Sequence, residues 1–162
     1  MIEIDLGSLV LWGLIATAVL TVVMTMAQGL GWSRISLPFM LGTAVTGRRM
    51  WAMVIGFGIH FALGVAFGLL YAWTFESLDR SSWWLGLLFG VLHGAFMLTV
   101  FIQVLPYIHP RMASKHRGPT PTRQLEPPGF LALNYGRNTP LVTMVAHVLY
   151  GLILGALYNQ GG

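Results

Sequence analysis

The chain has 162 residues, of which 56% are hydrophobic and only 9% are charged, and its formal net charge at pH 7 is +4. Soluble globular domains carry about 25% charged residues, so this composition excludes a soluble protein and indicates an integral membrane protein. The sequence contains no cysteine, which excludes disulfide bonds, thiolate nucleophiles, iron–sulfur ligation and covalent c-type haem attachment.

Four long stretches of the chain contain no Asp, Glu, Lys or Arg. Each is long enough to supply the roughly 20 residues that cross a hydrocarbon core of about 30 Å. We therefore predict an all-α membrane protein, a four-helix bundle that forms one transmembrane domain over residues 1–162. The predicted spans are residues 9–30, 51–75, 83–105 and 140–158, joined by loops at 31–50 and 106–139 and by a turn at 76–82.

The charges are distributed unevenly between the two sides of the predicted membrane. Eight of the nine Lys and Arg residues lie in the loops 31–50 and 106–139, whereas four of the five acidic residues lie in the N-terminal segment and the turn 76–82. The positive-inside rule places both loops in the cytoplasm and both termini outside the inner membrane. Basic loops also favour anionic lipid head groups over nucleic acid. The predicted head-group contacts are Arg48, Arg49, Arg111, Lys115 and Arg117.

The first span carries Thr17, Thr21 and Thr25 at a spacing of four residues. In a membrane helix a threonine hydroxyl commonly bonds the carbonyl one turn back, so this stripe is typical of a helix-contact face. The alternative is a water-lined path, which would make the protein a small-solute channel. The loop that follows is apolar in its middle, from Leu37 to Val45, and we expect it to lie in the membrane interface.

The second span contains the pattern His60, Gly64, Gly68, Tyr71, which returns 87 positions later as His147, Gly151, Gly155, Tyr158. The third span carries glycines at the same spacing. Small residues four apart lie on one helix face and allow close helix packing. The predicted packing residues are Gly56, Gly64, Gly68, Gly86, Gly90, Gly94, Gly151 and Gly155.

The repeated pattern predicts a duplicated two-helix unit, whose copies have the same orientation and a pseudo-twofold axis along the membrane normal. The turn at 76–82 is short, so the second and third spans are expected to be antiparallel neighbours. The second loop, which contains most of the prolines, is the least regular part of the chain.

Three histidines lie inside the predicted spans. Counted at 1.5 Å per residue, His60 and His147 lie about 12–14 Å, and His93 about 18 Å, from the cytoplasmic ends of their helices. The three side chains are therefore expected at similar depth. Ionisable groups within a membrane usually face the bundle interior and mark candidate functional sites.

Three interpretations of these histidines remain open. In the first, each ring is neutral and bonds a Thr, a Tyr or a carbonyl of a neighbouring helix. In the second, His60 and His147, or His93, are axial ligands of a b-type haem. In the third, imidazole and thioether groups bind copper, with His93 beside Met97 and Met144 beside His147.

Catalysis has little support in the sequence. No Asp or Glu lies inside a span, so the bundle offers no buried carboxylate for acid–base chemistry or for orienting a histidine. The chain also lacks a glycine-rich phosphate loop and a zinc helix motif.

The paired His-and-Gly helices, the glycine-rich third span ending at Pro106, and the segment Pro127-Pro128-Gly129-Phe130 resemble uncharacterised small bacterial inner-membrane proteins of the YagU type. The resemblance implies a bacterial inner-membrane location and no defined chemistry. We therefore expect a non-catalytic accessory or scaffolding subunit, which packs against itself or against a larger membrane complex. The alternatives are a haem- or copper-binding redox protein and a small-solute channel.

Overall fold

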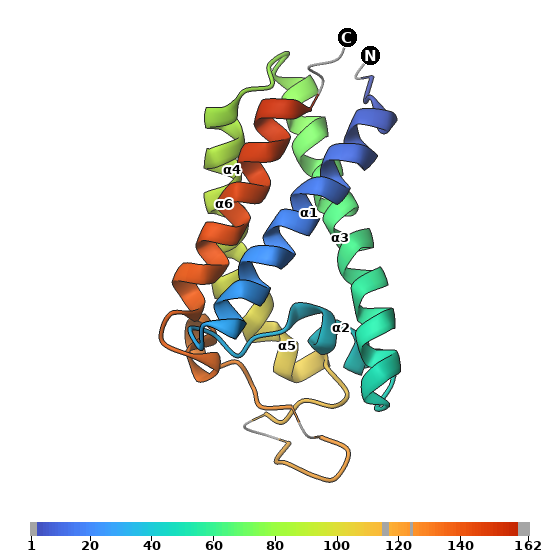
Figure 1. Ribbon diagram of the computed structural model, residues 1–162, viewed down its shortest axis with the longest axis vertical. Helices are drawn as coiled ribbons and strands as arrows, with labels where there is room; N and C mark the ends of the chain where they lie inside the picture. The colour runs from blue at the N-terminus through green and yellow to red at the C-terminus, as the bar shows by residue number, and fades with distance from the viewer. Residues whose placement is uncertain (1–2, 115–116, 124, 159–162) are drawn as a thin grey trace.

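The computed structural model describes residues 3–114, 117–123 and 125–158, and these residues form helices and loops without a strand. Four helical segments are long and apolar enough to cross a membrane: α1 (Leu6–Gly29), α3 (Arg49–Ser77), the segment Trp83–Ile108 and α6 (Thr139–Leu157). The predicted all-α fold with four spans is confirmed. α1 begins and α6 ends at one end of the bundle, called here the terminal end, and the opposite end is called the loop end (Figure 1).

The third span is divided into three parts. It consists of α4 (Trp83–Phe96), a π-helix, η1 (Met97–Phe101), and α5 (Ile102–Ile108). Within η1 the N–H of Ile102 donates to the carbonyl of Met97, five residues back, which widens the turn. The helix also continues past Pro106, where the sequence predicts the end of the span.

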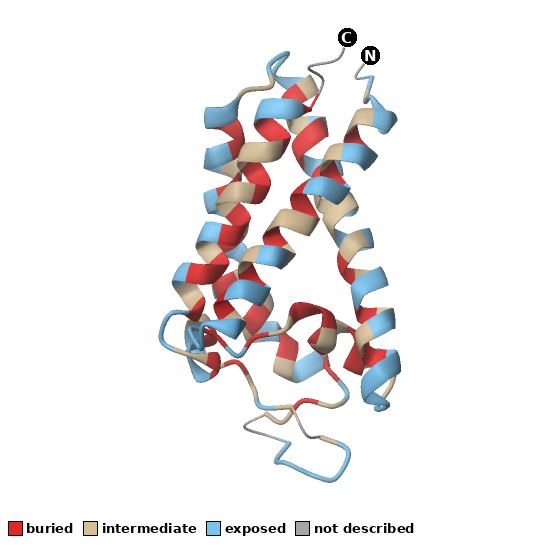
Figure 2. Cartoon of the chain, viewed as in Figure 1, coloured by how far each residue is buried: buried red, intermediate tan, exposed pale blue. Residues whose placement is uncertain are grey.

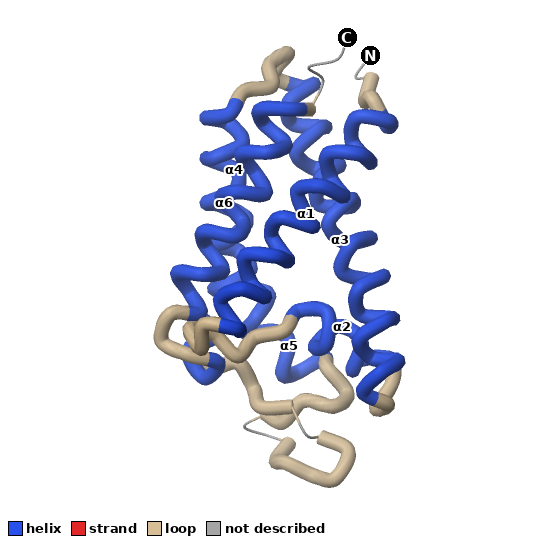
Figure 3. Tube along the Cα trace, viewed as in Figure 1, coloured by secondary structure: helices blue, strands red, loops and turns tan. Residues whose placement is uncertain are grey.

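Two short helices lie at the loop end. The first, α2 (Leu37–Val45), occupies the apolar part of the first loop, and the second, η2 (Phe130–Tyr135), is a 3₁₀-helix before α6. Proline stands near the start of both α2 and α6, where its missing N–H costs nothing. Loop segments gather beneath these helices (Figure 3).

The spans α4 and α6 pack closely through their glycines. A methyl group at Gly86 would lie 2.1 Å from the carbonyl oxygen of Gly151, and one at Gly155 would lie 2.4 Å from the carbonyl oxygen of Ser82. The two backbones are therefore in direct contact along the glycine faces. In lipid, where apolar side chains gain little by leaving the solvent, such van der Waals contact is a main source of helix association.

The glycines of α3 contact three different helices. Gly56 contacts α2, since a methyl group there would lie 1.7 Å from the carbonyl oxygen of Pro38. Gly64 faces Thr17 of α1, and Gly68 faces Leu9 of α1 and the hydroxyl of Tyr150 of α6. The single packing face predicted for this span is thus shared among α1, α2 and α6.

α3 and α4 follow each other along the chain, but their contact is made by side chains. Phe67 stacks on His93 with ring centroids 4.3 Å apart, and Phe89 lies against Tyr71 and Phe75 at 5.8 and 6.3 Å. The closely packed pairs are instead α4 with α6, α2 with α3, and α1 with both α3 and α6. The duplication of a two-helix unit stays a prediction.

The loop end is tied together by hydrogen bonds that join distant parts of the chain. Ser33 and Thr139 share a hydroxyl–hydroxyl bond of 2.9 Å, and Gln103 donates to the carbonyl of Gly129 at 3.1 Å. Arg34 pairs with Glu126 at 3.3 Å, although both side chains are largely exposed, so this pair adds little stability. Buried residues gather on the inward faces of the helices, and the outward faces are mostly exposed (Figure 2).

We expect Gly151→Ala to lower the free energy of unfolding by about 1–3 kcal/mol, because the added methyl group overlaps the carbonyl of Gly86. The measurement is unfolding in mixed micelles, followed by circular dichroism. Gly58→Ala is the matched control: nothing lies within 4 Å of a methyl group there, so this variant should be neutral or more stable by up to about 1 kcal/mol. Equal losses in both variants would contradict the α4–α6 contact.

Candidate functional site

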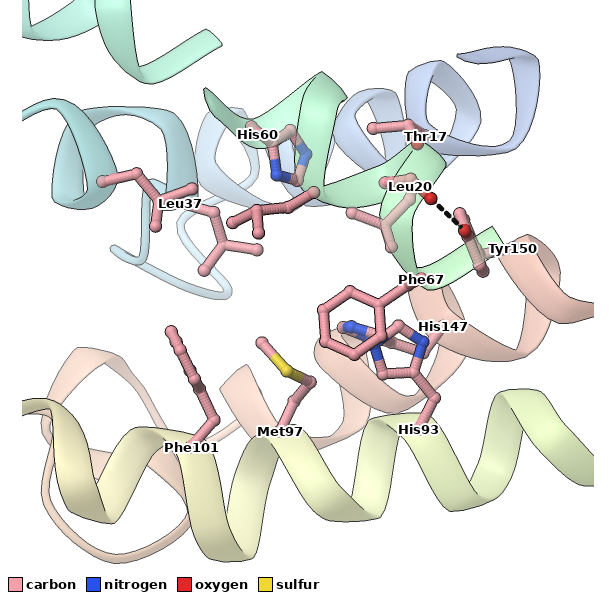
Figure 4. Close-up of a pocket in the computed structure, with 13 residues that line it drawn as sticks. Thr17, Leu20, Leu37, His60, Phe67, His93, Met97, Phe101, His147 and Tyr150 are labelled. Atoms are coloured by element: carbon pink, nitrogen blue, oxygen red, sulfur yellow. Dashed lines mark hydrogen bonds between the residues drawn. The ribbon is translucent and has the colours of Figure 1, made fainter. Parts of the chain in front are cut away.

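A cavity of about 160 Å³, called here the central cavity, lies between α3 and the third span, with α1, α2 and α6 completing its wall (Figure 4). Most of its lining is apolar. The apolar side chains are Leu20, Leu37, Leu41, Leu63, Phe67, Met97 and Phe101. The polar side chains that line it are the three intramembrane histidines, Thr17 and Tyr150.

The π-helix contributes directly to this cavity. Its first residue, Met97, and its last residue, Phe101, both line the cavity, one and two turns after His93. π-helical turns are rare and occur frequently at functional sites. The irregular part of the third span therefore coincides with the cavity wall.

His60 lies on α3 with only 8% of its surface exposed. Its Nε2 is 3.0 Å from the hydroxyl of Thr21, and that hydroxyl donates its one proton to the carbonyl of Thr17 at 2.6 Å. The Thr21 oxygen must then accept, so His60 donates from Nε2. This assignment leaves His60 Nδ1 as an acceptor.

His147 lies on α6 with 3% of its surface exposed. Its Nδ1 is 2.8 Å from the carbonyl of Thr143, which can only accept, so Nδ1 carries the proton and Nε2 is the acceptor. His93 packs edge-on against this ring, with centroids 4.7 Å apart, and its Nδ1 lies 3.3 Å from the hydroxyl of Tyr71.

The hydroxyl groups of the cavity wall are already engaged. Thr17 donates to the carbonyl of Gly13 at 2.7 Å, and Tyr150 donates to the carbonyl of Gly64. Thr25, the third member of the threonine stripe, is exposed on the outside of α1. Thr17 and Thr21 therefore make helix contacts, and the small-solute channel stays a prediction.

The residues predicted as haem or copper ligands are only partly brought together. His93 and His147 are adjacent, while Met144 packs against Gly94, where a methyl group would lie 3.0 Å from its sulfur. The cavity volume of 160 Å³ is about half of the smallest typical pocket for a drug-sized molecule, and haem binding stays a prediction. Within the described ranges, no group of three His, Cys, Asp or Glu side chains could hold a metal ion.

The arginines predicted to meet lipid head groups have different environments. Arg48, Arg49 and Arg117 are exposed, and Lys115 lies outside the described residues. Arg111 is partly buried and donates to the carbonyls of Thr43 and Ala44 at 2.8 and 3.3 Å. These carbonyls belong to the last turn of α2, where a cation is favoured by the helix dipole.

Sequence reasoning did not single out His109, which is buried at the end of α5. Its Nε2–H donates to the carbonyl of Met40 at 2.9 Å, and its Nδ1 accepts from the backbone N–H of Arg111 at 3.1 Å. Burial lowers the pKa of His109, the bond to Met40 opposes this effect, and the charge of Arg111 adds to it. Neutral His109 thus joins the third span to α2.

No family model, curated protein or solved structure matches this chain. The resemblance to YagU-type proteins stays a prediction.

We expect His109 to make the loop end sensitive to acid. Its folded-state pKa is lowered, so its contribution to stability is present above the unfolded value of about 6.5 and is lost as the pH falls below it. Protonation removes the acceptor at Nδ1 and costs about 1 kcal/mol, the typical net value of one hydrogen bond.

The measurement is thermal unfolding between pH 7.5 and 5, compared with His109→Gln, which does not titrate. Wild type should lose stability relative to the variant as the pH falls. Parallel curves for the two proteins would show that His109 does not titrate on unfolding.

Proposed function

We propose that this protein is a non-catalytic multi-pass membrane protein that binds a small, mainly apolar molecule in the central cavity. The observation that carries the proposal is the cavity itself, which is apolar, lies within the bundle and is walled by the π-helix. Apolar cavities of about 150 Å³ stay dry and bind molecules of the size of benzene.

An approach route from the lipid supports this proposal. A second hollow of about 370 Å³ lies between the terminal-end parts of α3 and α4 and is lined by Phe89, Leu92 and Phe96, among others. Phe67 and His93 belong to the linings of both spaces. A rotation of these two stacked rings would connect the cavity with the membrane interior.

The predicted spans 9–30, 51–75, 83–105 and 140–158 contain no Asp or Glu, which supports binding without catalysis. Under this proposal the loop end faces the cytoplasm of a bacterial inner membrane, in keeping with the arginines that are concentrated there. The exposed ones contact anionic lipids.

The binding proposal predicts that benzene shifts the ¹³C-methyl resonance of Met97 in the detergent-purified protein, with saturation. Met97 lines the cavity, whereas Met50 on α3 is 76% exposed and lines none of the cavities described here. Met50 therefore reports any general effect of benzene dissolved in the micelle. A Met97 signal that only follows Met50 would refute the proposal.

Two matched variants sharpen this experiment. Leu41→Phe should fill the cavity and abolish the benzene effect on Met97 at little cost in stability, because Leu41 lines the free space. Leu88→Phe, on the exposed face of α4, should leave the benzene effect unchanged.

A second proposal is that the protein is an accessory or scaffolding subunit, associating through α3 with itself or with a larger membrane complex. Its support is the poor coverage of this helix within the chain: 17% of the residues in its most apolar stretch are buried, against 44% in α6. The glycine faces are engaged inside the bundle, so the contact would use large exposed side chains such as Val54 and Leu70.

Single-cysteine variants test this association, since the natural chain has no thiol. Oxidation of Val54→Cys in native membranes should give a disulfide-linked dimer if α3 pairs with itself. If α3 meets another subunit, Val54→Cys labelled with a benzophenone maleimide, whose photoexcited ketone inserts into C–H bonds, should give an adduct of defined larger mass. The control is Val22→Cys, at an equally exposed position of α1. Neither product, or the same products from both variants, would refute the role of α3.

A further inference from the structure

Two hydrogen-bond acceptors of the central cavity have no donor among the residues that the structure describes. The hydroxyl groups of Thr17 and Tyr150 already donate hydrogen bonds to backbone carbonyls within the bundle. His60 Nδ1 and His147 Nε2 remain as acceptors, and within the described part of the chain no hydrogen bond reaches either atom. The cavity therefore has two acceptors and no free hydroxyl donor in its described lining, and its third histidine, His93, pairs through Nδ1 with the hydroxyl of Tyr71.

A ligand that brings a hydrogen-bond donor to such an acceptor gains more than an apolar ligand of equal shape. The two imidazoles come from different helices, with His60 on α3 and His147 across the cavity on α6, beside His93 and Phe67 (Figure 4). A ring placed between them would contact aromatic side chains on its faces and edges.

We propose that the ligand of the central cavity is a phenol, a single aromatic ring whose hydroxyl donates to His60 Nδ1 or His147 Nε2. This inference rests on the proposed binding function and adds the chemical class of the ligand. The ring fills the apolar space beside Phe67, Met97 and Phe101, and the hydroxyl uses the acceptor that the protein leaves open. Phenols without a tail, and lipids with a phenolic head, share this chemistry.

The test compares phenol, benzene and anisole in titrations of the detergent-purified protein, read from the Met97 methyl resonance. Benzene lacks the hydroxyl, and anisole has the oxygen without the donor proton. Phenol should bind roughly tenfold more tightly than either, the ratio expected for one hydrogen bond. The ¹⁵N resonance of one acceptor nitrogen, in His60 or His147, should move with phenol and stay unchanged with benzene.

Two variants identify the acceptor. His60→Leu and His147→Leu are titrated with both phenol and benzene, and benzene binding shows that the cavity is still folded. In the variant that lacks the acceptor, phenol should fall to the affinity of benzene. If both variants retain the preference for phenol, the inference is wrong.

Different results would overturn the phenol inference and the apolar binding function. Equal binding of phenol, benzene and anisole to wild type would overturn the phenol inference and leave the apolar binding function standing. No saturable shift of Met97 with any of the three would overturn both. A lipid source is distinguished from a free phenol by adding a phenol with a long para-alkyl chain, which should bind more tightly only if the tail leaves through the space between α3 and α4.

Discussion

The backbone contact between α2 and α3 is the constraint on which the rest of the structure depends. A methyl group at Gly42 would lie 1.7 Å from the carbonyl of Ala52, as close as one at Gly56 would lie to Pro38. This contact fixes a short helix between α3 and the other spans at the loop end. α3 consequently packs on α2 along its first turns and on α1 and α6 further on, while α4 packs on α6. The central cavity is the space left between the pair α2–α3 and the pair α4–α6. Leu37 and Leu41 of α2 form part of its wall.

Much of the fold could be predicted from the sequence because hydrocarbon imposes simple rules. Charges such as Asp5, Arg49 and Glu76 mark the ends of apolar stretches, and the four spans follow from them within a few residues. The similar depth of His60 and His147 also follows from the rise of a helix, and both line the same cavity.

Partner choice and local irregularity could not be predicted in this way. Spacing places Gly56, Gly64 and Gly68 on one face but does not reveal that the first contacts α2 and the others contact α1 and α6. The nine residues of α2 are too few for periodicity to separate a helix from an apolar loop. The π-turn at Met97 has no signature in composition, and the engagement of Thr21 and Thr143 by the histidines depends on rotamers and tautomers that only the assembled bundle determines.

The π-turn also bears on how this chain is compared with others. A turn closed by a bond from residue i to residue i−5 holds one more residue than an α-helical turn, so the part of the third span beyond Phe101 is displaced by one position relative to the part before it. The helical periodicity that places His93 and Gly94 on their faces is therefore offset by one residue from the periodicity that places Gln103 and Leu105. A relative whose third span is a regular α-helix would align with this chain only across a single-residue gap near Thr99, and that gap would mark the residue by which the π-turn differs from an α-helical turn.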